Sequence, residues 1–96
     1  MAAQATATLD ANAEECGPIT VLRGQTASLH IVVTGTITVT LQRNMGTLGY
    51  VTVDKPDGTD AAFTANFTGL IDGSGEYKLV ASGVSGGSAV CSLAVE

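Results

Sequence analysis

Length and composition restrict this chain to one small domain with an aliphatic core. Its 96 residues suffice for a two-layer core but leave little chain for an elaborate catalytic cleft, and with 4% aromatic residues and no Trp the core must come from Val, Ile, Leu and Ala. The net charge is −5 and the four basic residues are scattered along the chain, which argues against direct binding to nucleic acid or to an anionic membrane surface.

The first segment, residues 1–9, alternates weakly in polarity, and we predict that it is an N-terminal arm or an edge strand. The residues available to an assembly arm are Ala2, Ala3, Gln4, Ala5, Thr6, Ala7, Thr8 and Leu9. The segment lacks a basic region followed by a long apolar run, so it does not resemble a secretory signal, and we expect synthesis in a cytoplasm. Residues 10–18 then form a polar connection that ends in a Gly-Pro breaker.

From residue 19 onward the sequence predicts short strands separated by turns that contain Gly. The predicted strands cover residues 19–23, 26–34, 36–43, 49–54, 61–67, 75–82 and 88–95. In the third of these, Ile37, Val39 and Leu41 alternate with threonines, so one face belongs to the core and the threonine face contacts either water or another protein. A type I turn is expected at "KPDG", residues 55–58.

This spacing of strands and turns predicts an all-β protein. We expect a single antiparallel β-sandwich, Ig-like or jelly-roll-like, with about seven or eight short strands. Because the sequence shows no internal linker, repeat or helical pattern, residues 1–96 are expected to form one domain.

The segment "DGSGEYKL" suggests a structural role for Tyr77 and Leu79. Tyr77 follows Gly75 and a loop Asp at 72, and Leu79 lies on the same face of the predicted strand. This spacing resembles the tyrosine corner of immunoglobulin-like sandwiches, in which the hydroxyl bonds to the backbone of the preceding loop. The alternative is a half-buried Tyr in an ordinary strand.

Two cysteines, Cys16 and Cys91, lie far apart in the sequence. They could form a disulfide that closes a long loop, or they could be buried free thiols that act as small hydrophobes. Without a secretory signal we favour free thiols in a reducing compartment. Neither has a second Cys or a His at metal-ligand spacing, so no zinc site is predicted.

Other candidates for chemistry are few. His30 is the sole histidine, lies mid-strand opposite the core side chains, and is expected to be a surface or interface residue. Asp54, Asp57 and Asp60 crowd one turn, but their spacing is not that of an EF-hand, and Asp is common in β-turns. The sequence therefore predicts no catalytic, metal or cofactor site, and we expect that the protein is not an enzyme.

Two patterns resemble those of small virion proteins of tailed bacteriophages, which commonly contain a "G-x-V-x-L-Q-R" strand, an aromatic residue after a short loop, and a later "G-x-Y-[KR]-[LV]" strand. The matching residues are Gly35, Val39, Leu41, Gln42, Arg43, Tyr50, Gly75, Tyr77, Lys78 and Leu79. The resemblance covers about residues 19–95. The chain departs from the pattern at "NMGTLGY", where an Asp-Gly-Gly loop and a Trp would be typical.

The resemblance implies a structural protein of the virion, made in the host cytoplasm, that needs no cofactor. It would bind a capsid surface as a decoration (cement) protein and bridge neighbouring subunits, as a homo-oligomer for which a trimer is expected. The arm at residues 2–9 would add a strand to an adjacent subunit. One alternative is a phage tail or fibre component. The other is an Ig-like binding module, either an adhesin or a carbohydrate-binding domain, and an oxidised Cys16–Cys91 pair would favour this module.

Overall fold

The computed structural model describes residues 4–53 and 60–95. Its elements are the strands β1 (Gln4–Leu9), β2 (Glu15–Val21), β3 (Thr26–Asn44), β4 (Tyr50–Thr52), β5 (Ala62–Phe63), β6 (Phe67–Asp72) and β7 (Gly75–Val95), and the 3-10 turn η1 (Gly46–Leu48). All strand pairs are antiparallel, which confirms the predicted all-β sandwich. The described residues contain no helix that is long and apolar enough to cross a membrane.

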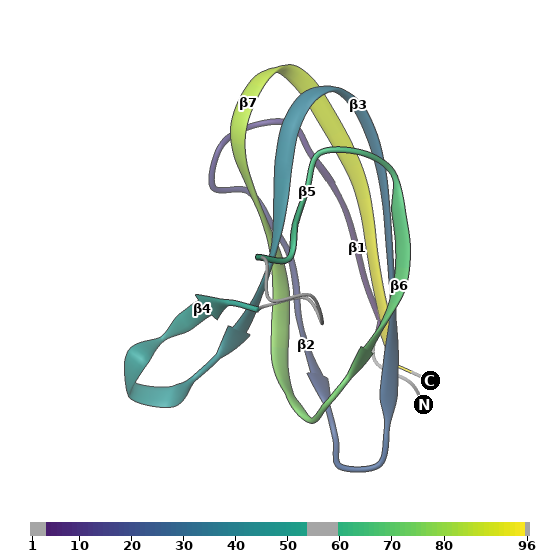
Figure 1. The fold of residues 1–96 in the computed structure, drawn as a ribbon, viewed down its shortest axis with the longest axis vertical. Helices are drawn as coiled ribbons and strands as arrows, with labels where there is room; N and C mark the ends of the chain where they lie inside the picture. The colour runs from purple at the N-terminus through teal and green to yellow at the C-terminus, as the bar shows by residue number, and fades with distance from the viewer. Residues whose placement is uncertain (1–3, 54–59, 96) are drawn as a thin grey trace.

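Two long strands, β3 and β7, form the centre of the molecule. They pair with each other from Ala27 opposite Val95 to Arg43 opposite Tyr77, so one ladder runs through most of the chain's core. Midway, the register shifts where Thr36 faces two residues of β7, and both strands bend over the top of the molecule (Figure 1). A single seven-stranded sheet therefore folds onto itself and produces both layers of the sandwich.

Each layer contains one half of the β3–β7 pair and its flanking strands. In the first layer, β1 pairs with the C-terminal part of β7, and β6 pairs with the N-terminal part of β3. In the second layer, β2 pairs with the N-terminal part of β7, and β4 and β5 pair with the C-terminal part of β3. The order within the first layer is therefore β1–β7–β3–β6.

The bend explains why the strands are longer than the sequence predicts. Gly35 separates two expected strands, and the "GVSGG" segment (83–87) separates two more, yet each pair is one continuous strand. Gly35 has φ +75° and Gly86 has φ +69°, values that L side chains rarely adopt. Glycine here redirects the backbone while the ladder continues on both sides, so these residues mark corners within strands and not turns between them.

Alternate side chains from both layers meet in one core. The buried residues are Leu9, Cys16, Ile19, Val21, Ala27, Leu29, Ile31, Ile37, Val39, Leu41, Ala61, Phe63, Ile71, Tyr77, Leu79, Ala81, Ala89, Cys91, Leu93 and Val95. The core is largely aliphatic, as the composition requires.

Two other boundaries differ from the prediction, and one predicted turn is not described. β2 begins at Glu15, so the expected Gly-Pro breaker lies inside a strand, beside a register shift between Cys16 and Ile19. The expected strand 61–67 is instead the short β5 followed by β6, which begins at Phe67. The predicted turn at 55–58 lies outside the described residues, as do Asp54 and Asp57.

Candidate functional site

The segment expected to be an arm or an edge strand lies within the chain's own sheet. Gln4–Leu9 forms β1 and pairs with residues 89–94 of β7. Leu9 is buried, and Ala5 and Ala7 pack against the core. Ala2 and Ala3 lie outside the described residues. Donating this strand to a neighbouring subunit would require that it leave β7 and uncover Leu9.

The two cysteines are free thiols that lie close together in the core. The Cys16 Sγ lies 3.6 Å from the carbonyl oxygens of both Ala5 and Cys91. Burial raises the pKa of the Cys16 thiol, and burial together with the neighbouring Cys16 raises the pKa of Cys91 to about 12. Both thiols are therefore protonated at neutral pH and serve as small apolar side chains.

Tyr77 closes the turn between β6 and β7. Its buried side chain donates a hydrogen bond from the hydroxyl to the Gly73 carbonyl at 3.1 Å, which is the type of contact that a tyrosine corner makes. The Arg43 guanidinium lies 6.0 Å from the Tyr77 ring centroid and donates from Nη2 to the Ser74 carbonyl at 2.7 Å. Leu79, two residues along β7, is fully buried. These contacts fix the turn on the end of the second layer.

The remaining candidates for chemistry lie on the surface. His30 is exposed, and its Nδ1 lies 2.7 Å from Thr68 Oγ1 on the neighbouring strand. Asp60 is exposed as well. Within the described ranges, 4–53 and 60–95, no group of three His, Cys, Asp or Glu side chains is placed to hold a metal ion.

The structure also reveals a projecting hairpin, formed by the end of β3, η1 and β4. Residues 43–52 make up this β3–β4 hairpin, which extends away from the second layer (Figure 1). At its turn, Met45 N–H donates to the Gly49 carbonyl at 2.8 Å. Leu48 is 76% exposed and Met45 is 45% exposed, and no charged residue occurs between 44 and 52. An uncharged tip with two large apolar side chains in water is unusual for a loop and suggests a contact surface.

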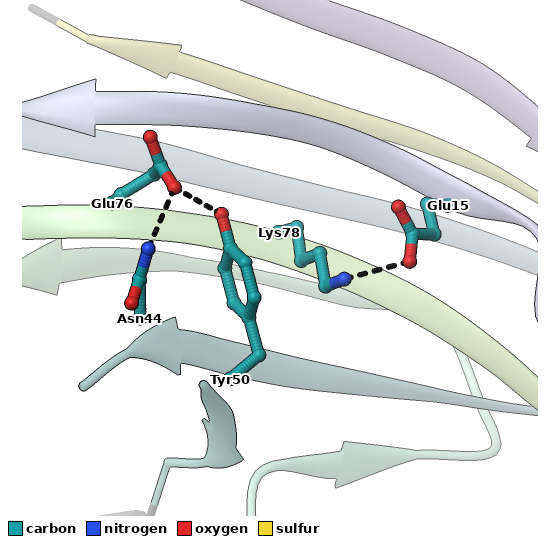
Figure 2. Close-up of polar contacts among 5 residues, drawn as sticks. All are labelled: Glu15, Asn44, Tyr50, Glu76 and Lys78. Atoms are coloured by element: carbon teal, nitrogen blue, oxygen red, sulfur yellow. Dashed lines mark hydrogen bonds and ion pairs between the residues drawn. The ribbon is translucent and has the colours of Figure 1, made fainter. Parts of the chain in front are cut away.

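The base of the hairpin is fixed to β7 by a polar cluster, which we call the Tyr50 cluster (Figure 2). The Tyr50 hydroxyl donates to Glu76 Oε1, and Asn44 Nδ2 donates to the same oxygen at 3.1 Å. Lys78 Nζ lies 4.1 Å from the Tyr50 ring centroid and forms an ion pair with Glu15 at 2.7 Å. Hydrogen bonds and a cation–π contact therefore hold the hairpin against the second layer.

The electrostatics of the Tyr50 cluster favour one protonation state. Burial, followed by the bond to the Glu76 carboxylate, raises the pKa of Tyr50 to about 12. The hydrogen bonds from Tyr50 and Asn44 lower the pKa of Glu76. Tyr50 is thus a neutral donor and Glu76 an ionised acceptor throughout the neutral range, so the cluster has a positioning role and is not poised for proton transfer.

The second surface is the outer side of the first layer, which we call the uncharged face. Its side chains lie in rows across β1, β7, β3 and β6. The rows are Gln4, Ala94, Ser28 and Leu70, then Thr6, Ser92, His30 and Thr68, then Thr8, Val90 and Val32. Among the side chains that the structure describes, no Asp, Glu, Lys or Arg belongs to these rows.

The sequence could not predict either surface as a unit. Alternation assigns each residue to a face of its own strand, but it does not say which strands are neighbours, and the uncharged face combines residues from 4 to 94. The hairpin tip was expected only as a loop within the pattern "NMGTLGY". No family model, curated protein or solved structure matches the chain. Function is therefore argued from these surfaces.

Proposed function

We propose that this chain is a structural virion protein of a tailed bacteriophage, which decorates the capsid surface and bridges neighbouring subunits. The observation that supports it most is the β3–β4 hairpin, a projection with an uncharged tip, apolar side chains at that tip and a fixed base. The resemblance to phage virion proteins supplies the biological setting. The two strand patterns that make up that resemblance are neighbours in space, since Leu41, Gln42 and Arg43 pair with Leu79, Lys78 and Tyr77.

The hairpin would dock on a capsid subunit by burying its tip. Full burial of an exposed apolar side chain contributes roughly 1.5–3 kcal/mol, and Leu48, at 76% exposed, would gain most of this amount and Met45, at 45%, about half. Association itself costs an estimated 4–15 kcal/mol, so one tip is a weak anchor. Because the Tyr50 cluster already orders the hairpin, little further conformational entropy is lost on docking.

Bridging follows from repetition of this weak contact. Copies that associate with one another would engage several capsid subunits at once, and the high effective concentration of the second site strengthens attachment without new contacts. In this proposal the partners are a capsid protein and further copies of the chain, the location is the virion, and synthesis takes place in the host cytoplasm. A tail or fibre position is the alternative within the same setting.

The test compares two exposed leucines on different turns. Leu48 is at the hairpin tip, whereas Leu22 follows β2 and is 60% exposed, so Leu48→Ser and Leu22→Ser are matched in chemistry. Assembled particles are purified on a density gradient from phage-infected cells that produce each variant, and the chain is quantified against the major capsid protein by mass spectrometry. We expect the unaltered chain and Leu22→Ser in stoichiometric ratio with capsid protein, and a several-fold loss for Leu48→Ser.

Two results would overturn the proposal, and a third would replace it by its alternative. Absence of the unaltered chain from particles would remove the virion role. Equal retention of both variants would show that the hairpin tip is not the docking element. Recovery with isolated tails instead of heads would replace capsid decoration by the tail alternative.

A further inference from the structure

Two copies of this chain, we propose, pack face to face through the uncharged face of the first layer. The inference goes beyond capsid decoration, because self-association of the isolated chain requires no capsid. It also names two copies in place of the trimer expected from the resemblance. Four observations lead to it: the distribution of charge, the size of the side chains, their arrangement, and the area of the face.

The distribution of charge makes the outer side of the first layer the most favourable surface for contact with a second copy. The protein carries a net charge of −5, so most encounters between copies bring carboxylates together. Of the acidic residues placed in the structure, Asp10, Glu14 and Asp60 lie outside the strands of the uncharged face, and Glu15 and Glu76 lie in the second layer. Asp72 is the last residue of β6, opposite Thr26 and beyond the rows of the uncharged face. Face-to-face contact through the first layer places the second layers on opposite sides of the pair. Their carboxylates are then about three sheet spacings of ~10 Å apart, beyond the Debye length of ~8 Å at physiological salt.

The side chains of this face suit close packing of two sheets. Apart from Gln4, His30 and Leu70, its members are Ser, Thr, Ala or Val, so the face is shallow and two sheets can approach to the usual spacing of ~10 Å. Ser and Thr hydroxyls can donate and accept hydrogen bonds across such an interface. His30 already bonds to Thr68, which fixes its ring at the surface.

Apolar side chains lie on the two central strands, in the row of the face nearest the bend. Val32 and Val90 are directly opposite each other on the two central strands and are 38% and 47% exposed. Leu70, on the edge strand β6, is 70% exposed. Weakly associating interfaces are about as apolar as the rest of a protein surface, so this mixture of apolar side chains and hydroxyls is compatible with such an interface. When the uncharged face packs on an identical face, the contact is isologous and closes at two copies.

The area of the uncharged face determines the expected affinity of the dimer. Four strands of about seven residues, at ~3.3 Å per residue and ~4.8 Å between strands, cover roughly 440 Å² per copy. Two copies would bury roughly 900 Å² in total, below the 1,200–2,000 Å² of standard stable interfaces. The pair is therefore a weak dimer, half-associated at micromolar to millimolar concentration, which forms readily only where copies are concentrated.

Sedimentation velocity of the isolated full chain, from about 1 μM to 1 mM, tests this inference. Val32→Lys introduces a charge on a central strand of the face, and Thr20→Lys introduces the same charge on the exposed side of β2 in the second layer. Both variants lower the net negative charge equally, so the overall electrostatic repulsion between two copies is the same for both variants. We expect the unaltered chain to shift from monomer to dimer, Val32→Lys to weaken dimerisation at least tenfold, and Thr20→Lys to leave it unchanged or slightly stronger.

A second variant guards against loss of folding. Val90 is 47% exposed, and Val90→Thr keeps a β-branched side chain with high β-propensity, so the strand remains intact while an apolar contact is lost, and dimerisation should weaken several-fold. A chain that remains monomeric at 1 mM, a trimer, or equal effects of Val32→Lys and Thr20→Lys would each overturn the inference. These outcomes need no virus particle, so they leave the capsid proposal standing, and absence from particles would leave the dimer standing.

Discussion

Replacing glycines at the bend of β3 and β7 should separate two physical effects that usually occur together. An added Cβ at Gly86 would meet nothing within 4 Å, but φ there is +69°. At Gly87 φ does not lie in the left-handed region, but a Cβ would lie 2.4 Å from the Thr36 carbonyl oxygen. At Gly35 both effects apply, since φ is +75° and a Cβ would lie 2.8 Å from the Gly86 carbonyl oxygen.

The magnitudes follow from these geometries. Left-handed backbone costs a non-glycine residue roughly 1–2 kcal/mol. Forcing backbone atoms apart costs about 1–3 kcal/mol more. We therefore expect Gly86→Ala to lower the free energy of unfolding by about 1–2 kcal/mol and Gly35→Ala by about 2–5 kcal/mol. Alanine also lowers the entropy of the unfolded chain, by about 0.4–1 kcal/mol, but this offset is common to all three sites and cancels in the comparison.

Urea denaturation followed by far-ultraviolet circular dichroism provides the assay. With a slope of roughly 1–2 kcal/mol per molar urea for a domain of this size, the midpoints of Gly35→Ala and Gly86→Ala should differ by about 1 M. Gly87→Ala should also lie below Gly86→Ala, although it lacks the φ penalty. Equal midpoints for the three variants would refute the reasoning, because the close approach of β3 to β7 at the bend would then have no energetic consequence.

Two further predictions concern titratable side chains. Cys16 and Cys91 should resist iodoacetamide at neutral pH in the folded protein and react fully in denaturant, because burial raises both thiol pKa values; rapid labelling of the native protein would contradict the buried pair. The absorbance step of Tyr50, isolated as the difference between the unaltered chain and Tyr50→Phe, should be centred near pH 12. Since the folded pKa is raised above the ordinary 10.0, the neutral phenol stabilises the fold below pH 10, and this contribution disappears as the pH rises through 12. A step at pH 10 would show that the burial of Tyr50 and its bond to Glu76 do not persist in solution.

The fold class could be predicted from the sequence because local patterns determine it. Alternation at residues 36–43 assigns Ile37, Val39 and Leu41 to the core, and all three are buried. The same patterns did not predict where strands end, because the sequence alone does not distinguish a glycine within a bent strand from a glycine in a turn between two strands. Whether the chain continues at Gly35 depends on its partner residues 85–87, about fifty positions away.

The surfaces were harder to predict for a related reason. Tyr77 was expected to bond to the preceding loop, because both partners lie within one short segment, and the structure places its hydroxyl on Gly73. The Tyr50 cluster joins residues from four separate strands, and nothing local to Tyr50 indicates Glu76 or Lys78. Sequence periodicity locates a side chain on its own strand, whereas a surface depends on which strands become neighbours.

The central position of β7 has a consequence for the order in which the molecule can be built. This strand supplies the main ladder of both layers, and β1, β2 and β3 all pair with it. Neither layer can therefore close before residues 75–95 have been synthesised. The strands β4, β5 and β6 can pair with β3 earlier, but β1, β2 and the other edge of β3 must wait with unpaired backbone groups. With contacts this distant in sequence, folding is expected to be slow for a domain of this length. During that interval exposed strand edges are a hazard for aggregation, and the polar threonines and serines on β1 and β3 reduce the hydrophobicity of those waiting segments.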